Sequence, residues 1–332
     1  MKKLIIIFAV LLLIFTSCDT TDPKMPEEKP PGYQEDIPWP SLADSPWPMF
    51  RGNPQYTGRS KIIGPSSGNV KWDYDTGGYI EAGAIVGFDN SVIFQTGLQK
   101  RGVFKLGTGG ELDWFYPVNE ISFGTTPLIL SDSTIIVSSY IGGKIIALSY
   151  SGKEKWVYDT GTYITSRGMN VGLDGTIYFI DTTRTLFALS KNGNLNWKLK
   201  FESLGFIPSS PSLMAFSPNG ETLYIKGKSA AVFAVDIKQK NIIWSYGNSN
   251  WVVSAPLVDS QGNIYFYGLP NEFSESLYLI KLNPSGVVDW EFSISKIIKS
   301  GFFFAPTMDY NGNIYFGVLK GGTEHCLSLI HI

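Results

Sequence analysis

Three aspartates recur in similar surroundings and are the first residues whose type and spacing suggest chemistry. Asp174, Asp259 and Asp309 stand in the stretches LDGTIYF, VDSQGNIYF and MDYNGNIYF. A repeated fold that brought these carboxylates together would create a metal or catalytic site. The stretch at Asp309 even begins like a calcium loop, because Asn311 and Asn313 follow at alternate positions.

The details of that stretch argue against calcium. Its glycine, Gly312, comes too early, and Lys320 stands where a calcium loop carries its bidentate glutamate. Aspartate, asparagine and glycine are also the residues that best form tight turns. We therefore interpret the three aspartates as turn residues and expect no metal site and no cofactor.

Other catalytic residue types are scarce. The only histidines are His325 and His331, which argues against a histidine-based triad or an imidazole metal site. The patterns GxxxxGK[ST], HExxH and GxSxG are absent. Two cysteines, Cys18 and Cys326, are too few for a disulfide framework. No residue is therefore predicted to be catalytic, and the protein is expected not to be an enzyme.

The composition favours strands and tight turns. Among 332 residues there are 35 glycines, 17 tyrosines, 21 phenylalanines and 9 tryptophans, and only 17% of the residues are charged. The formal net charge is −2, and the sequence contains no basic stripe of the kind that binds nucleic acid. We therefore expect no nucleic-acid partner.

The N-terminus has the features of an export signal. Two lysines, an apolar run over 4–15 and the pair Thr16–Ser17 precede Cys18. The run is shorter than the roughly 20 residues that span a membrane. Thr16–Ser17–Cys18 resembles the bacterial lipobox, which implies a signal peptide over 1–17 and a lipid on Cys18. The alternative is an ordinary cleaved signal with an incidental cysteine.

A proline-rich stretch over 18–46 follows and shows no apolar periodicity, so the sequence predicts an extended tether there. These features predict a membrane-anchored lipoprotein of the bacterial cell envelope, on its periplasmic or cell-surface side. The choice between the inner and the outer membrane stays open.

A tryptophan recurs along the rest of the chain at intervals of 41 to 47 residues, and a glycine stands four residues before five of the six: Trp72, Trp114, Trp156, Trp197, Trp244 and Trp290. Two further patterns keep step with it, a proline after small residues and a GxIYF-like stretch. Each period therefore predicts four short strands joined by tight turns.

Four strands in roughly 43 residues is the size of one β-propeller blade. A solenoid is the competing architecture, but solenoid repeats of this length are usually helical. We therefore predict an all-β propeller of four-stranded blades. In such a fold each tryptophan would lie on the next blade and cover the seam between them.

These repeats resemble those of the pyrroloquinoline-quinone (PQQ)-type propeller family. The pattern AxxxxGxxxW is kept over 147–156 and 188–197, and WPMFRGNPQYTGRS over 47–60 resembles a segment that often precedes such repeats. The resemblance implies a propeller over 47–326. The quinoprotein dehydrogenases of this family carry an adjacent cysteine pair that is absent here, and their calcium ligands match no position.

The C-terminal region is expected to be incomplete. Five complete repeats end at Trp290, a partial sixth starts near Ser300, and 327–332, LSLIHI, resembles a non-native tail. This favours a propeller truncated from seven or eight blades. In the alternative, LSLIHI is a genuine third strand and Trp72 closes a six-bladed ring.

The predicted function is a non-enzymatic scaffold or binding protein, by resemblance to the β-propeller lipoprotein of the outer-membrane β-barrel assembly machinery. We expect a monomer, anchored through its lipid, that binds another envelope protein. The alternative is a PQQ-dependent dehydrogenase, or a carbohydrate-active or sugar-binding protein, with key residues beyond the sequence. If the protein is an enzyme, Trp251 and Phe302–Phe304 would line the mouth of a channel. If it is not, we expect these residues to pack in the core.

Overall fold

The computed structural model describes ten stretches of the chain: 29–80, 82–119, 125–164, 168–201, 213–227, 232–247, 251–270, 277–293, 305–320 and 324–330. Cys18, the signal peptide over 1–17 and Phe302–Phe304 lie outside the described residues. Within them every regular element is a strand. Among these same residues, no helix is long and apolar enough to cross a membrane.

In the described part of the chain, six antiparallel sheets follow one another, and each takes its strands from one repeat. Blade 1 contains β1 (Ile85–Val86), β2 (Val92–Thr96), β3 (Gly102–Leu106) and β4 (Leu112–Pro117); blade 2 contains β5 (Leu128–Ile129), β6 (Ile135–Ser139), β7 (Lys144–Leu148) and β8 (Glu154–Asp159); blade 3 contains β9 (Asn170–Val171), β10 (Ile177–Ile180), β11 (Thr185–Leu189) and β12 (Leu195–Lys200).

The remaining three blades continue this order. Blade 4 contains β13 (Met214–Phe216), β14 (Thr222–Lys226), β15 (Val232–Asp236) and β16 (Asn241–Tyr246); blade 5 contains β17 (Val252–Val253), β18 (Leu257–Val258), β19 (Ile264–Leu269), β20 (Tyr278–Leu282) and β21 (Val288–Ser293); blade 6 contains β22 (Thr307–Met308), β23 (Ile314–Lys320) and β24 (Glu324–Ile330). In blade 5 both β17 and β18 pair with β19, so that blade has two short inner strands.

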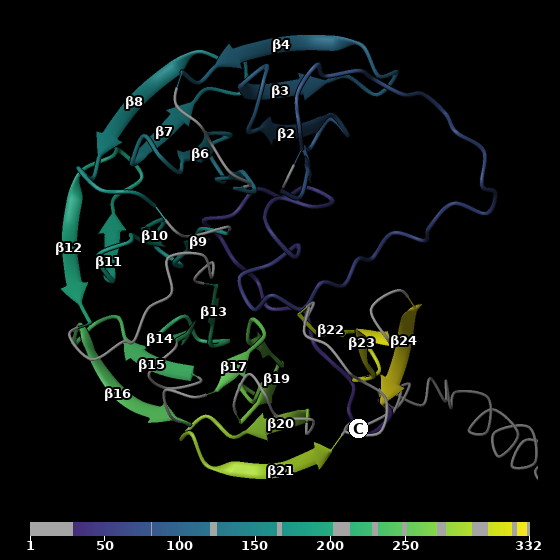
Figure 1. Ribbon diagram of the computed structural model, residues 1–332, viewed down its shortest axis with the longest axis vertical. Helices are drawn as coiled ribbons and strands as arrows, with labels where there is room; N and C mark the ends of the chain where they lie inside the picture. Colours follow the sequence, from purple (N-terminus) through teal and green to yellow (C-terminus); the bar gives the residue numbers. More distant parts are fainter. Residues whose placement is uncertain are drawn as a thin grey trace, which may run out of the picture.

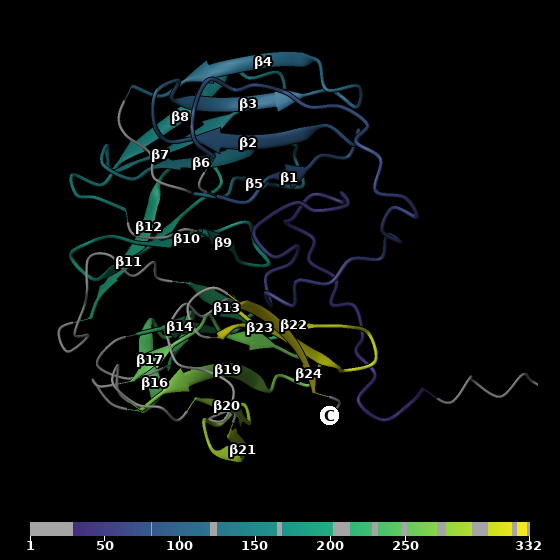
Figure 2. The ribbon, with the colours of Figure 1, turned by 45° about the vertical axis from the view of Figure 1, so that its right-hand side comes forward.

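The blades lie around a common centre, with the first strand of each blade innermost and the tryptophan-bearing strand at the rim (Figure 1). Figure 2 shows the same blades obliquely, with blades 1 and 2 at one end and blades 5 and 6 at the other. This arrangement is a β-propeller, and the predicted strand order within each repeat is confirmed.

Burial explains the sequence pattern of each blade. The middle strand β11 is buried along its whole length, because it is covered by strands on both edges and by neighbouring blades on both faces. The rim strand β12 instead alternates between exposed and half-buried residues. A β-bulge breaks the pairing of the third and fourth strands in each of blades 1 to 5.

Blade 6 has three strands among the described residues. Its β24 pairs with β23 from Lys320↔Glu324 to Ile314↔Ile330. The part of the LSLIHI stretch over 327–330 therefore lies in a paired strand.

The N-terminal segment differs from the extended tether expected over 18–46. Gln34, Trp39, Ser41 and Ala43 are buried, and Trp39 joins the largest apolar cluster of the molecule. Its described part, 29–46, forms no strand of its own, which agrees with the lack of a periodic apolar pattern there. Its isolated apolar residues instead fill spaces between blades, and Figure 1 shows it, in purple, passing through the middle of the propeller.

Candidate functional site

Residues 47–57 occupy the centre of the propeller and form hydrogen bonds to the innermost strand of every one of the six blades. Five backbone N–H groups and one side-chain amide donate to backbone carbonyls of this central segment, at 2.8 to 2.9 Å: Val86 to Trp47, Ile129 to Pro48, Asn170 Nδ2 and Phe216 to Pro54, Val258 to Gln55, and Met308 to Thr57. One stretch of chain thus accepts a hydrogen bond from the innermost strand of each blade, and without it the five backbone N–H groups would lose these partners.

The side chains of the central segment fill the axis. Met49 and Tyr56 have no exposed surface, and burial raises the pKa of the Tyr56 phenol well above its usual range. The Arg51 guanidinium donates to the carbonyls of Tyr56 and Pro306, which ties the segment to blade 6. Burial lowers the pKa of Arg51 to about 10, so this side chain is still a cation at neutral pH.

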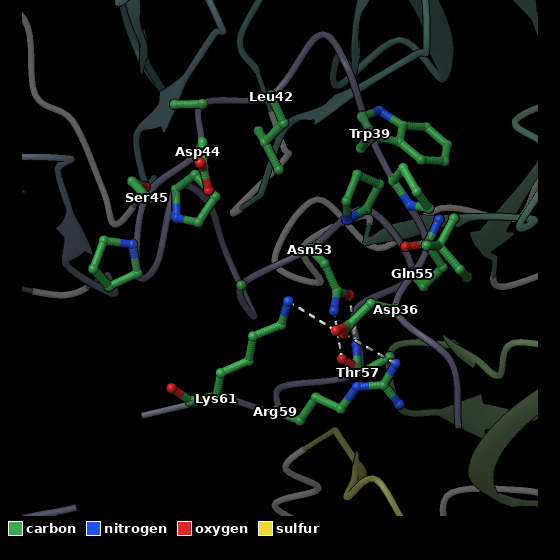
Figure 3. A pocket seen from close by; sticks show the side chains of 18 of the residues that line it. Asp36, Trp39, Leu42, Asp44, Ser45, Asn53, Gln55, Thr57, Arg59 and Lys61 are labelled. Atoms are coloured by element: carbon green, nitrogen blue, oxygen red, sulfur yellow. Dashed lines mark hydrogen bonds and ion pairs between the residues drawn. The ribbon is translucent and has the colours of Figure 1, made fainter. Parts of the chain in front are cut away.

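A groove of about 880 Å³ opens beside the central segment. Its walls are two passes of the N-terminal chain, over 36–48 and 52–62, and blades 2, 5 and 6 add Ser131, Val258, Ser260 and Tyr310 (Figure 3). This volume falls within the range of small-molecule sites in proteins. We call it the N-terminal groove.

Charged groups of both signs lie at the mouth of the groove. Asp36 accepts hydrogen bonds from Lys61 Nζ at 2.8 Å and from the Tyr310 hydroxyl at 3.0 Å. Burial acts to raise the pKa of Asp36, but these hydrogen bonds and the charges of Lys61 and Arg59 outweigh it and hold the pKa below its usual value. Asp36 is therefore ionised at neutral pH.

Arg59 is held in the wall of the groove. Its Nη2 atom donates to the Glu35 carbonyl at 2.7 Å, and its Cζ atom lies 4.7 Å from the ring centroid of Tyr310. Only 6% of its side chain is exposed. On the opposite wall, Asp44 is exposed, and its negative charge contributes to a raised pKa of Lys61, after the larger effects of Asp36.

The three recurring aspartates lie in turns of blades 3, 5 and 6, between the first and second strands. Asp174 accepts hydrogen bonds from Thr176, and Asp259 and Asp309 accept from the asparagine four residues later and the tyrosine six residues later. Their carboxylates are thus engaged within their own turns. Among the described residues, no group of three or more metal-binding side chains comes together.

Four of the recurring tryptophans contact a glycine turn of the following blade. Each indole N–H donates, at 3.0 to 3.1 Å, to a carbonyl two residues before the glycine: Trp72 to Thr108, Trp114 to Tyr150, Trp156 to Lys191 and Trp244 to Pro284. A Cβ atom added to Gly110, Gly152, Gly193 or Gly286 would lie 2.6 to 2.7 Å from the indole. Residues around Trp72 form no strand, yet Trp72 meets blade 1 in the same way.

The other predicted residues have different surroundings. Trp197 packs on Tyr178 and Trp290 on Tyr265, each within its own blade. Trp251 packs on Tyr246, at 5.9 Å between ring centroids, and a Cβ at Gly268 would lie 2.8 Å from its ring.

Sequence reasoning missed the N-terminal groove and the residues that line it. Gln55 and Arg59 belong to a stretch over 47–60 for which the sequence predicts only a position in front of the repeats. The available signal was composition: arginine, glutamine and asparagine stand among prolines and aromatic residues over 47–59, which is unusual for a flexible linker.

Six blades around a filled centre define the class of this protein, a β-propeller. Residues 58–206 match the family described as "Outer membrane protein assembly factor BamB". The repeats in this stretch are PQQ-like β-propeller repeats. No curated protein sequence matches it.

Solved structures share the fold at low sequence identity. Quinohemoprotein alcohol dehydrogenase from Comamonas testosteroni is 14% identical with a TM-score of 0.58, and the match covers 82% of this chain and 57% of that one. Virginiamycin B lyase from Staphylococcus aureus is 13% identical with a TM-score of 0.53, over 76% and 84% of the two chains. BamB from Moraxella catarrhalis is 15% identical with a TM-score of 0.48, over 76% and 88%.

Proposed function

We propose that this protein is a lipid-anchored, extracytoplasmic scaffold of the bacterial cell envelope that binds another envelope protein and catalyses no reaction. The observation that carries the proposal is the occupied centre. Residues 47–57 are bonded to all six blades, and the side chains of Met49 and Tyr56 are fully buried there.

A propeller enzyme that held a cofactor on its axis would need that space for the cofactor. Here the protein fills it with its own chain, which fixes the blades relative to one another. A rigid ring of this kind is suited to presenting loops to a partner at fixed spacing, because little conformational entropy is lost on binding.

The family match supports an envelope partner. The family is described as an outer membrane assembly factor, and its matched region includes blades 1, 2 and 3. We further propose that a lipid on Cys18 anchors the chain, that residues 18–33 form the tether and that the protein acts as a monomer. Gly32 already lies beside Gly312 of blade 6, and the backbone is hydrogen-bonded to the propeller from Gln34 onward.

The partner is tested by mild crosslinking in intact cells followed by purification of the full-length protein. We expect one envelope protein to be enriched reproducibly, in an amount comparable with the scaffold. A scaffold that is always recovered alone would contradict the proposal. A Cys18→Ala variant, expected to lose metabolic labelling with palmitate and membrane retention, tests the anchor separately.

The enzymatic alternative has its own assay. Purified protein is supplied with PQQ, calcium and a range of alcohols, and reduction of an artificial electron-acceptor dye is followed. We expect no reduction above that of heat-treated protein. Dye reduction that saturates with PQQ would replace the scaffold with a dehydrogenase.

A further inference from the structure

The N-terminal groove contains an unusual concentration of polar atoms that are buried without a hydrogen-bond partner. They are Ser45 Oγ, Gln55 Nε2, Arg59 Nε, Arg59 Nη1 and Ser260 Oγ, and each exposes less than 1 Å². All four residues line the groove. Folded proteins pair nearly all such atoms, so a cluster of them at one cavity points to a partner that belongs there.

The chemistry of these atoms indicates what that partner offers. Gln55 Nε2, Arg59 Nε and Arg59 Nη1 can only donate hydrogen bonds, and Arg59 carries a positive charge. The Asp36 carboxylate lies 4.0 Å from Arg59 Nη2, but Arg59 Nε, Arg59 Nη1 and Gln55 Nε2 have no hydrogen-bond partner, so these three donors suit a further negatively charged acceptor. The hydroxyls of Ser45 and Ser260 can donate or accept, which suits neutral hydroxyl groups on the same ligand.

The charges around the groove limit the charge of the ligand. Asp36 and Asp44 balance Arg59 and Lys61 among the lining residues, so the lining is formally neutral. A doubly charged phosphate would be repelled by the two carboxylates, whereas a single carboxylate can be held close to Arg59.

The walls are fixed before any ligand binds. Proline residues at 38, 40, 46, 48 and 54 line the groove and restrict its backbone. Hydrogen bonds attach both passes to the blades: Ala43 N–H donates to the Ile129 carbonyl at 3.0 Å, and the Gln55 carbonyl accepts from Val258 at 2.9 Å. The Gln55 and Arg59 donors expose less than 1 Å², so their side chains must rotate to meet a ligand, and Arg59 then gives up its hydrogen bond to the Glu35 carbonyl.

We propose that the N-terminal groove binds a small sugar acid. Its carboxylate accepts hydrogen bonds from Arg59 and Gln55, and its ring hydroxyls pair with Ser45 and Ser260. This proposal goes beyond the scaffold function and does not rest on it, because a small ligand can bind in the groove without the lipid anchor or an envelope partner.

The test is isothermal titration of the full mature protein with D-glucuronate and with D-galacturonate. We expect at least one to bind with a millimolar or lower dissociation constant. Its methyl ester and D-glucose, which lack the negative charge, should bind at least about 10-fold more weakly, the loss expected when a charged hydrogen bond of about 1.4 kcal/mol or more is removed.

Matched variants assign the binding to this groove. Arg59→Gln should weaken uronate binding at least about 10-fold, whereas Arg101→Gln, which removes an arginine that bonds the Asn119 carbonyl in blade 1, should leave it unchanged. Ser45→Ala removes an unpartnered hydroxyl, so it should fold normally and weaken binding about 3-fold. It keeps the test valid if Arg59→Gln does not fold.

Three results would overturn the proposal. The first is no binding of either uronate at about 10 mM, a concentration well above the expected dissociation constant. The second is equal binding of the acid and its ester, which would assign a neutral sugar. The third is equal binding of N-acetylalanine, which would assign a general carboxylate site. A failed crosslinking experiment would leave each of these outcomes unaffected.

Discussion

The turn that precedes the rim strand differs between blade 4 and blades 1, 2, 3 and 5. In blade 3, Gly193 has a φ of +83° and its N–H donates to the Ser190 carbonyl, three residues earlier. In blade 4, Lys240 takes a φ of +60° and its N–H donates to the Asp236 carbonyl, four residues earlier. The blade 4 turn is one residue longer and contains no glycine.

Two physical effects favour glycine in the short turns of blades 1, 2, 3 and 5. A positive φ disfavours any residue with a Cβ atom, and the indole of the preceding tryptophan lies where that Cβ would be. Blade 4 keeps the positive φ but not the glycine. The recurrent glycine is therefore explained by the flat contact of the indole as well as by the turn itself.

Some seams place a tryptophan on a glycine turn of the next blade, whereas the seam between blades 3 and 4 faces a turn without glycine. Replacement of the tryptophans should give the largest difference in stability between these two kinds of seam. Trp156→Ala should lower the free energy of unfolding by about 3 kcal/mol, because it removes a large half-buried ring and its hydrogen bond to Lys191. Trp197→Ala, at the seam that faces blade 4, should lose about 1 kcal/mol less. Urea unfolding followed by circular dichroism measures both, and equal losses would contradict a special role for the glycine turn.

The glycine itself gives the second test. Gly193→Ala places a Cβ atom 2.6 Å from Trp156 Cδ2 at a positive φ, so we expect a loss of about 2 kcal/mol. Lys240→Ala, at the equivalent turn of blade 4, should change the free energy of unfolding by less than about 0.5 kcal/mol. A tolerated Gly193→Ala would show that the indole can move away at little cost.

The seam between blades 1 and 2 adds a charged network that should make it sensitive to acid. Asp89 of blade 1 accepts from Tyr150 of blade 2 and from Lys105. Burial acts to raise the pKa of Asp89, but hydrogen bonds from Ser91, Tyr150 and Lys105 outweigh it and leave the pKa lowered. Burial and the hydrogen bond to Asp89 raise the pKa of Tyr150 to about 12.

Because the pKa of Asp89 is lower in the folded protein, its ionised form stabilises the fold above the unfolded pKa of about 4, and this is lost as the pH falls below that value. The wild type should therefore be more stable than Asp89→Asn at pH 7, and the difference should shrink between about pH 4 and pH 2. Urea unfolding across that range measures it. If the difference in stability between the wild type and Asp89→Asn does not depend on pH, the charge of the Asp89 carboxylate does not stabilise the fold.

The smallest expected effect is a gain in stability. Lys240→Gly relieves the strain of a positive φ but adds freedom to the unfolded chain, so we expect a stabilisation of only about 0.5 kcal/mol. Thermal unfolding measures the change. Lys238→Gly is the control, because residue 238 lies in the same turn but has no positive φ. A destabilised Lys240→Gly variant would mean that the Lys240 side chain contributes contacts of its own.

The blades were predictable because the information for each lies within one period. The stretch GTIYF gives β10, TLFAL gives β11 and the strand around Trp197 gives β12, each with its own turn signals. Pairing between neighbours in sequence then determines the sheet. The fold class followed from repetition alone.

The N-terminal groove and the buried part of the N-terminal segment were not predictable in this way. Trp39 is buried because blades 3 and 4 place Val171 and Phe216 beside it, far away in the sequence. An isolated tryptophan among prolines has no local pattern that indicates burial. The same holds for Arg59, whose stacking partner Tyr310 lies in blade 6.

The hydrogen bonds of the central segment also constrain the order of assembly during synthesis. Residues 47–57 are made before any blade, yet their last partner, Met308, is made about 250 residues later. At roughly 5 to 20 residues per second, the segment waits on the order of 10 to 50 seconds before its hydrogen bonds can all form. A segment made before all of the blades is thus among the last to acquire all of its hydrogen bonds.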